Sequence, residues 1–137
     1  MNNIIISKNE LSMLSSNDAT NKLIELFPIS NNNYSSVFSL IASKSWKTHD
    51  QRKLAKYYLQ KMPFAVSTPY EVFASFMNIE NLISVIEELL PSNKSDLNLL
   101  QYYLIPTLTK NCKSEDDIAA VNNFLNKLKV INASLVQ

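Results

Sequence analysis

Apolar residues recur three and four positions apart along most of the chain, which is the spacing of an α-helix that buries one face. The longest such stripe lies near the end, where Val121, Phe124 and Leu128 continue to Ile131 and Leu135. No segment alternates apolar and polar residues over the length of a strand, so the pattern predicts no sheet. We therefore expect an all-α protein.

Capping residues and prolines divide this pattern into seven or eight helices. The first is short and follows Ser7, which has capping-box spacing to Glu10. Pro106 lies inside the seventh helix, where it removes a backbone hydrogen bond, so we expect a kink or an end near Leu104. After the opening helix, the expected helices are 18–27, one from the Asn31–Asn33 loop to about Trp46, 48–62 capped by Thr48 and Gln51, one from Pro69 up to Asn78, 79–90, 96–110, and one from 115 onward.

The sequence repeats itself over part of its length. Glu25–Pro28 recurs as Glu88–Pro91, 63 positions later, and an apolar series follows each proline at the same offset. A fixed period is typical of stacked helical units, because neither unit can bury its apolar face alone. We predict a single domain over 1–137, built as two stacked three-helix units at 18–62 and 85–128. An orthogonal helix bundle is the alternative.

A local pattern in the first unit has a counterpart among known proteins. An Ala-x-x-x-Trp segment at 42–46 precedes Asp50, and the following helix ends in Tyr-Leu-Gln-Lys-Met-Pro at 58–63. This pattern resembles a unit of bacterial α-helical repeat proteins, and the two units together resemble HEAT or armadillo-type solenoids. The second unit departs from the pattern at Asn111 and Cys112, where an aromatic residue is expected. The resemblance implies a protein-binding scaffold and carries no catalytic residues.

Glycine is absent, although an average protein would contain about 7%. The P-loop, the dinucleotide-binding fingerprint and the nucleophile elbow all require glycine, so enzymes built on those motifs are excluded. Turns with positive φ are disfavoured for the same reason. The abundance of Asn, Lys, Ile and Ser, with a single arginine, indicates an AT-rich genome, as in a low-GC bacterium, a phage or a parasite.

Candidate catalytic and metal-binding residues are few. His49 is the only histidine and Cys112 the only cysteine, so one chain cannot assemble a tetrahedral zinc site or an internal disulfide. We expect His49 on the surface at a helix start, without the nucleophile that a general base would need. The acidic cluster Glu115–Asp117 is explained by the positive end of a helix dipole. We therefore predict no cofactor, no metal and no enzymatic activity.

The two ends of the sequence bear on localisation and on self-association. Ile4–Ile6 is too short to span a membrane and lacks a preceding cationic region, so we predict no signal peptide. A cytoplasmic protein is expected, with export by a leaderless route left open. The stripe of the last helix could form a homodimeric coiled coil, although an intramolecular core face is favoured because the stripe is short.

Charge is unevenly distributed. The formal net charge is only +1, which argues against a strongly basic nucleic-acid binder. Residues 44–61 nevertheless hold six basic side chains and one acid, whereas 64–118 hold eight acids and three lysines. On a helical wheel, the side of 48–62 away from the core presents Lys53, Lys56, Tyr57 and Gln60, and the corresponding side of the seventh helix presents Leu99 and Tyr102.

We interpret these six residues as candidate partner contacts. The alternatives are a solvated face for the first four and packing against a following helix for Leu99 and Tyr102. The predicted function is a non-enzymatic protein-binding module, such as an inhibitor, immunity or accessory effector protein of a bacterium or phage. The alternative is nucleic-acid or nucleoprotein binding through the lysine-rich face, and a weak enzyme built around His49 is the third hypothesis.

Overall fold

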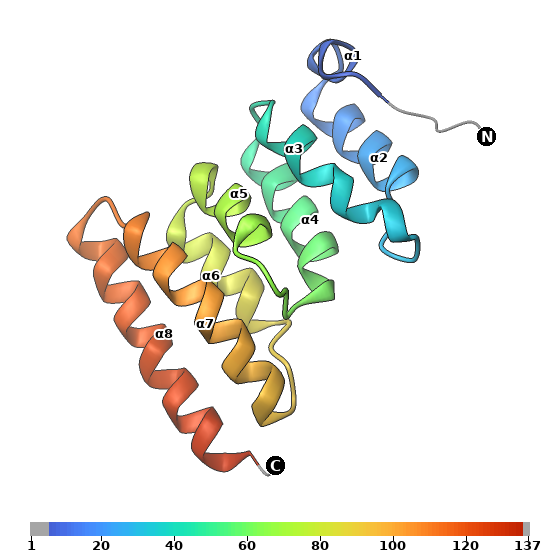
Figure 1. Cartoon of the computed structure of the whole chain (residues 1–137). Helices are drawn as coiled ribbons and strands as arrows, with labels where there is room; N and C mark the ends of the chain where they lie inside the picture. Colours follow the sequence, from blue (N-terminus) through green and yellow to red (C-terminus); the bar gives the residue numbers. More distant parts are fainter. Residues whose placement is uncertain (1–5, 136–137) are drawn as a thin grey trace.

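The computed structural model describes residues 6–135, and every regular element within them is helical (Figure 1). The predicted all-α fold of seven to eight helices is confirmed. The run Ile4–Ile6 lies largely outside the described residues. In chain order the elements are α1 (Lys8–Ser12), α2 (Ser16–Leu26), the 3-10 turn η1 (Asn32–Ser36), α3 (Val37–Ala42), α4 (Thr48–Tyr58), the 3-10 turn η2 (Leu59–Lys61), α5 (Thr68–Phe76), α6 (Ile79–Glu87), α7 (Lys94–Lys110) and α8 (Glu115–Ser134).

The helices alternate between two layers. α2, α4, α6 and α8 contact one another in succession, and so do α3, α5 and α7. From α4 onward, each helix therefore packs on the helix two places before it, and Figure 1 shows the resulting stack running from α1 at one end to α8 at the other. The predicted unit 18–62 covers α2–α4, whereas the predicted unit 85–128 begins near the end of α6 and covers α7 and most of α8, with α5 between the two. These contacts repeat after every two helices, whereas the sequence predicts units of three.

The core is continuous between the two layers. Phe38 of α3 packs edge-to-face on Tyr58 of α4 at 6.0 Å, on Phe64 at 6.1 Å and on Phe73 of α5 at 6.4 Å between ring centroids. Each such aromatic pair stabilises a protein by about 0.5–1.5 kcal/mol beyond the burial of its surface. The cluster therefore fixes α3, α4 and α5 against one another.

The helix starts at Ser7, Asn78 and Ser114 are capped by those side chains, whereas the expected starts at Asn31–Asn33 and Pro69 have no side-chain cap. Ser7 and Glu10 form the complete capping box of α1. Asn78 separates α5 from α6, and its side chain accepts the Asn81 N–H at 3.1 Å. No residue within 6–135 has a positive φ, so the described turns use conformations that need no glycine.

Several predicted boundaries are wrong. The helix expected at 79–90 ends at Glu87, and the one expected from Asn31–Asn33 becomes α-helical only at Val37. The third helix ends at Ala42 instead of near Trp46, whose buried indole donates to the Ile41 carbonyl at 2.8 Å across that end. Thr48 does not cap α4, which begins at that residue. Instead, Ser16 of α2 accepts the Lys47 N–H at 3.0 Å and donates to Asp50 at 2.6 Å.

The expected end of the seventh helix near Leu104 is also not observed. α7 continues past Pro106 to Lys110. Pro106 lies on the exposed side of the helix, so water can hydrogen-bond to the backbone carbonyl that the proline leaves without a partner.

Candidate functional site

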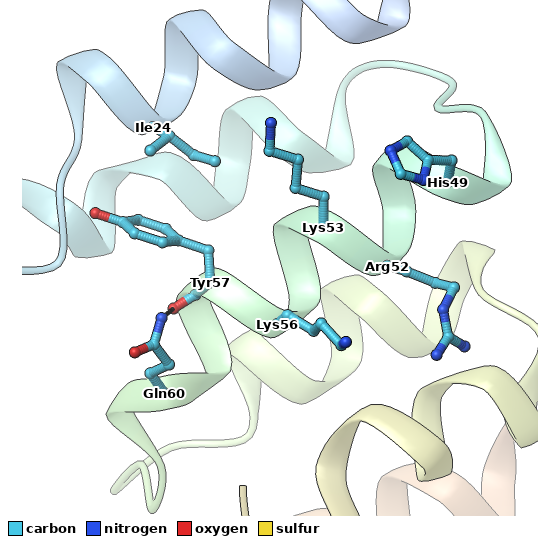
Figure 2. A pocket seen from close by; sticks show the side chains of 7 residues that line it. All are labelled: Ile24, His49, Arg52, Lys53, Lys56, Tyr57 and Gln60. Atoms are coloured by element: carbon cyan, nitrogen blue, oxygen red, sulfur yellow. Dashed lines mark hydrogen bonds between the residues drawn. The ribbon is translucent and has the colours of Figure 1, made fainter. Parts of the chain in front are cut away.

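The solvent-facing side of α4 forms the floor of a shallow hollow of about 430 Å³ (Figure 2). Six of its seven lining residues come from α4 and the η2 turn, and one comes from α2. The six are spaced by three and by one, so they form a single stripe along the helix, about 16 Å long at 1.5 Å per residue. The lining residues are Ile24, His49, Arg52, Lys53, Lys56, Tyr57 and Gln60.

The opposite side of α4 fixes this stripe in place. Leu54, Ala55, Tyr58 and Leu59 are buried. The Tyr58 hydroxyl lies within donating distance of two carbonyls at the end of α2, those of Leu23 at 3.1 Å and of the C-cap residue Phe27 at 3.0 Å. The helical wheel places Gln51, Ala55, Tyr58, Leu59 and Met62 on the core side of this helix, and the structure agrees in outline, although Gln51 and Met62 are only half-buried. The four predicted contacts Lys53, Lys56, Tyr57 and Gln60 are therefore brought together in one hollow.

On the α2 side, two lining residues are held by hydrogen bonds. The Lys53 ammonium donates to the Asn21 amide oxygen at 2.8 Å. The Tyr57 hydroxyl accepts the Ile29 N–H at 3.0 Å, and its ring packs edge-to-face on Tyr58 at 4.9 Å between centroids. Tyr57 lies on the side away from the core, as the helical wheel predicts, but its side chain is half-buried instead of exposed. Its ring is an ordered part of the surface.

On the α6 side, two further cations are held more loosely. The Arg52 guanidinium donates to the Asn81 amide oxygen at 3.3 Å, and the Lys56 ammonium lies 3.4 Å from the Glu88 carboxylate. Of the three permanent cations in the hollow, only Lys56 forms an ion pair with a carboxylate among residues 6–135. Arg52 and Lys53 have neutral partners, so their positive charge is not neutralised.

Three lining residues were not among the predicted contacts. His49 is exposed, as the sequence predicts, and lies at the start of the stripe. Arg52 lies four positions before Lys56 and therefore on the same side of the helix, so the helical wheel of 48–62 could have identified it as well. Ile24 carries no such signal, because its position beside α4 depends on the packing of α2.

Leu99 and Tyr102 lie elsewhere, on α7 in the other layer. Tyr102 is 71% exposed, whereas Leu99 is 36% exposed and therefore largely covered. The Tyr102 ring packs edge-to-face on Tyr103 at 4.9 Å. The structure therefore does not bring these two residues together with the hollow on α4, and their role in partner binding stays a prediction.

The stripe of the last helix is mostly internal. Val121, Phe124 and Leu128 are buried, and α8 contacts both α6 and α7. Ile118 and Val130 are 52% and 71% exposed on the remaining surface of α8. A homodimer through this helix stays a prediction.

Comparison with known proteins gave no match to a family model, a curated protein or a solved structure. Among residues 6–135, no helix combines the length and apolar character needed to cross a membrane. No group of three or more His, Cys, Asp and Glu side chains in this range is placed to hold a metal ion.

Proposed function

We propose that this chain is a non-enzymatic protein-binding module that uses the hollow on α4 as its contact surface. The supporting observation is the stripe from His49 to Gln60, which combines cations, an ordered aromatic ring and an amide on one helix face. Stacked helix pairs provide a rigid support for such a surface. A module of this kind occludes or scaffolds its partner, as a cytoplasmic inhibitor, immunity or accessory effector protein of a bacterium or phage would.

The chemistry of the two most reactive side chains supports a role without catalysis. His49 lies on α4, whereas Cys112 follows α7, and the two share no site in the lining of the hollow. Burial, together with the nearby Asp117 carboxylate, raises the pKa of the Cys112 thiol, so it stays protonated and weakly nucleophilic at neutral pH.

Site-specific photo-crosslinking tests this proposal. A photoreactive amino acid at Gln60 samples the hollow, and the same group at Lys129, exposed on α8, is the matched control. In an extract of the source organism, we expect one discrete protein crosslink at Gln60 and none at Lys129. Equal crosslinking at both positions, or a product only at Lys129, would contradict the proposal.

Nucleic-acid binding is the second candidate function, and the grouping of Arg52, Lys53 and Lys56 beside His49 favours it. Each phosphate contact to double-stranded DNA would change log K by about −0.9 per unit of log salt concentration. An oligonucleotide that binds with a slope near −3 would support this candidate. A protein partner with a much weaker salt dependence would support the first.

A further inference from the structure

We infer that the partner segment bound in the hollow is acidic and carries a large apolar side chain next to its carboxylates. This inference rests on the proposed function, since it specifies the chemistry of the partner at the same surface. It is argued from the charges, the apolar patch and the open shape of the hollow.

The charges of Arg52 and Lys53 favour a carboxylate. Both side chains donate to neutral amide oxygens, those of Asn81 and Asn21. A guanidinium has five N–H donors and an ammonium has three, so each cation keeps donors for a ligand. A carboxylate could therefore form charge-assisted hydrogen bonds here without breaking an ion pair.

The cations extend to both sides of the stripe. Figure 2 shows Lys53 pointing toward α2, whereas Arg52 and Lys56 point away from it. A segment lying along α4 would thus meet positive charge on each edge. This arrangement suits two carboxylates better than a single one.

Near Tyr57, and beside the Gln60 amide, the hollow presents an apolar patch. Figure 2 shows Ile24 beside the Tyr57 ring, and both side chains are half-buried. The hydrogen bond from the Ile29 N–H and the packing on Tyr58 already hold the ring in place, so little conformational entropy is lost when a ligand covers it. An apolar side chain of the partner fits this patch.

The shape of the hollow favours an elongated segment over a small molecule. Small-molecule sites bury most of the ligand surface, about 70–90%. Six of the seven lining residues here come from one helix face, which cannot enclose a ligand. A stripe of about 16 Å accommodates about 11 residues of helix or about five of extended chain.

Nucleic acid fits the same surface less well. Lys56 is partly neutralised by Glu88, which leaves two unpaired permanent cations. A duplex carries one negative charge per about 1.7 Å, so a binding stripe needs more cations than these. Glu88 itself is half-exposed at the edge of the hollow and would repel phosphates.

Selection from a displayed library of random peptides, each about 12 residues long, tests the inference on the full chain. We expect enriched peptides that contain two or more acidic residues next to Leu, Phe, Tyr or Trp. The absence of enrichment, or enrichment of peptides without acidic residues, would overturn the inference.

Synthetic peptides from the selection then measure the contribution of the cations by fluorescence anisotropy. Arg52→Gln with Lys53→Gln should weaken binding by about tenfold or more. Lys113→Gln with Lys129→Gln removes the same charge from positions outside the hollow and should change binding by less than about twofold, because exposed charges at such distances are screened. Equal weakening in both pairs would overturn the site assignment.

A third variant tests the apolar patch beside Tyr57. Ile24→Ala should weaken the acidic peptides by about three- to tenfold, while no change would remove the apolar part of the inference. Thermal unfolding of each variant verifies that it folds. If Gln60 crosslinks to a protein but the selected peptides are not acidic, the proposed function stands and only the acidic partner is overturned. If a single-stranded oligonucleotide binds more tightly than the peptides, the acidic partner is overturned in favour of nucleic acid.

Discussion

The hollow on α4 and the outer surface of α7 both present aromatic side chains that the sequence predicts to be exposed, yet they differ in how those side chains are held. Tyr57 is half-buried, with its hydroxyl bonded to the Ile29 N–H and its ring against Tyr58. Tyr102 is 71% exposed and packs on Tyr103. Because a pre-ordered side chain loses less entropy on binding, we expect the α4 surface to be the better contact site of the two.

The difference originates in the position of each helix within its layer. In the described residues, α4 has α2 on one side and α6 on the other, whereas α7 has only α5 as a neighbour in its own layer. Flanking helices raise the edges of a hollow and provide partners such as Asn21 and Asn81. Variants that act on one surface but not on the other test this explanation.

The largest effect is expected from the side chain beneath the hollow. Tyr58→Ala should lower the free energy of unfolding by about 3–5 kcal/mol, because Tyr58 is fully buried and its removal leaves a large cavity. Acidic-peptide binding should also be lost, since Tyr57 loses the ring on which it packs. Chemical denaturation and fluorescence anisotropy measure the two effects.

Leu104→Ala in α7 is the control for this prediction. Leu104 is fully buried, so a loss of about 2–5 kcal/mol is expected. Peptide affinity should be retained at temperatures where the variant is folded. A Tyr58→Ala variant of nearly unchanged stability would refute the assigned orientation of α4.

Alkaline pH should also lower the free energy of unfolding, by an amount comparable to the cost of Leu104→Ala. Burial raises the pKa of Tyr58 above its usual value, and burial likewise raises the pKa of Tyr70 to about 12 from 10.0. Because the folded-state pKa of each tyrosine lies above its unfolded value, the neutral hydroxyl makes its full contribution to stability below about pH 10. This contribution is lost as the pH rises through the folded pKa. For Tyr70, this contribution is of order 2 kcal/mol.

Urea denaturation at several pH values above about 9 measures this loss. Tyr70→Phe cannot ionise at this position, so its stability should decline less steeply in that window than that of the parent chain. At neutral pH the variant should be less stable than the parent, since the Tyr70 hydroxyl accepts the Phe64 N–H at 3.2 Å. Parallel pH profiles for the two proteins would show that Tyr70 does not contribute.

Local signals in the sequence predicted much of the fold and the outward face of α4. Ser7, Asn78 and Ser114 begin helices because each accepts a backbone N–H three residues later. The helical wheel likewise placed Lys53 and Lys56 on the exposed side. Both kinds of inference depend only on residues within one helix.

The features that the sequence did not predict depend on contacts between distant residues. Ser16 and Asp50 are 34 positions apart, so nothing in the sequence of α4 indicates this interaction at its start. The bond between Ile29 and Tyr57 spans 28 positions and turns an outward tyrosine into a half-buried one. The alignment of Ile24 with α4 is likewise a result of packing between helices.

Replacing the two tyrosines measures the contrast between the surfaces directly. Tyr57→Ala should cost about 1–3 kcal/mol, because it removes a half-buried ring and the acceptor for the Ile29 N–H. Tyr102→Ala should change stability by no more than about 0.5 kcal/mol, as is usual for exposed side chains. Thermal and chemical unfolding would check both values, and similar costs for the two would mean that Tyr57 is no better ordered than Tyr102.

The smallest effect on stability is expected from two exposed ion pairs of nearly equal length, only one of which lies beside the hollow. Lys56 and Glu88 lie 3.4 Å apart at the edge of the hollow, and Lys110 of α7 lies 3.5 Å from Glu71 of α5. Glu88→Gln and Glu71→Gln should leave the unfolding midpoint nearly unchanged, since exposed ion pairs contribute little. A glutamine at position 71 can still accept the hydrogen bond that Ser67 donates to Glu71.

Only Glu88→Gln should alter binding, because it releases Lys56 to a ligand and removes the negative charge at the edge of the hollow. The affinity for acidic peptides should rise by up to about fivefold, and the gain should shrink with added salt as charges are screened. Glu71→Gln changes the net charge equally but acts on the α5–α7 layer, so its effect should be negligible. An equal rise in both variants would show that the peptides respond to total charge instead of to the cations on α4.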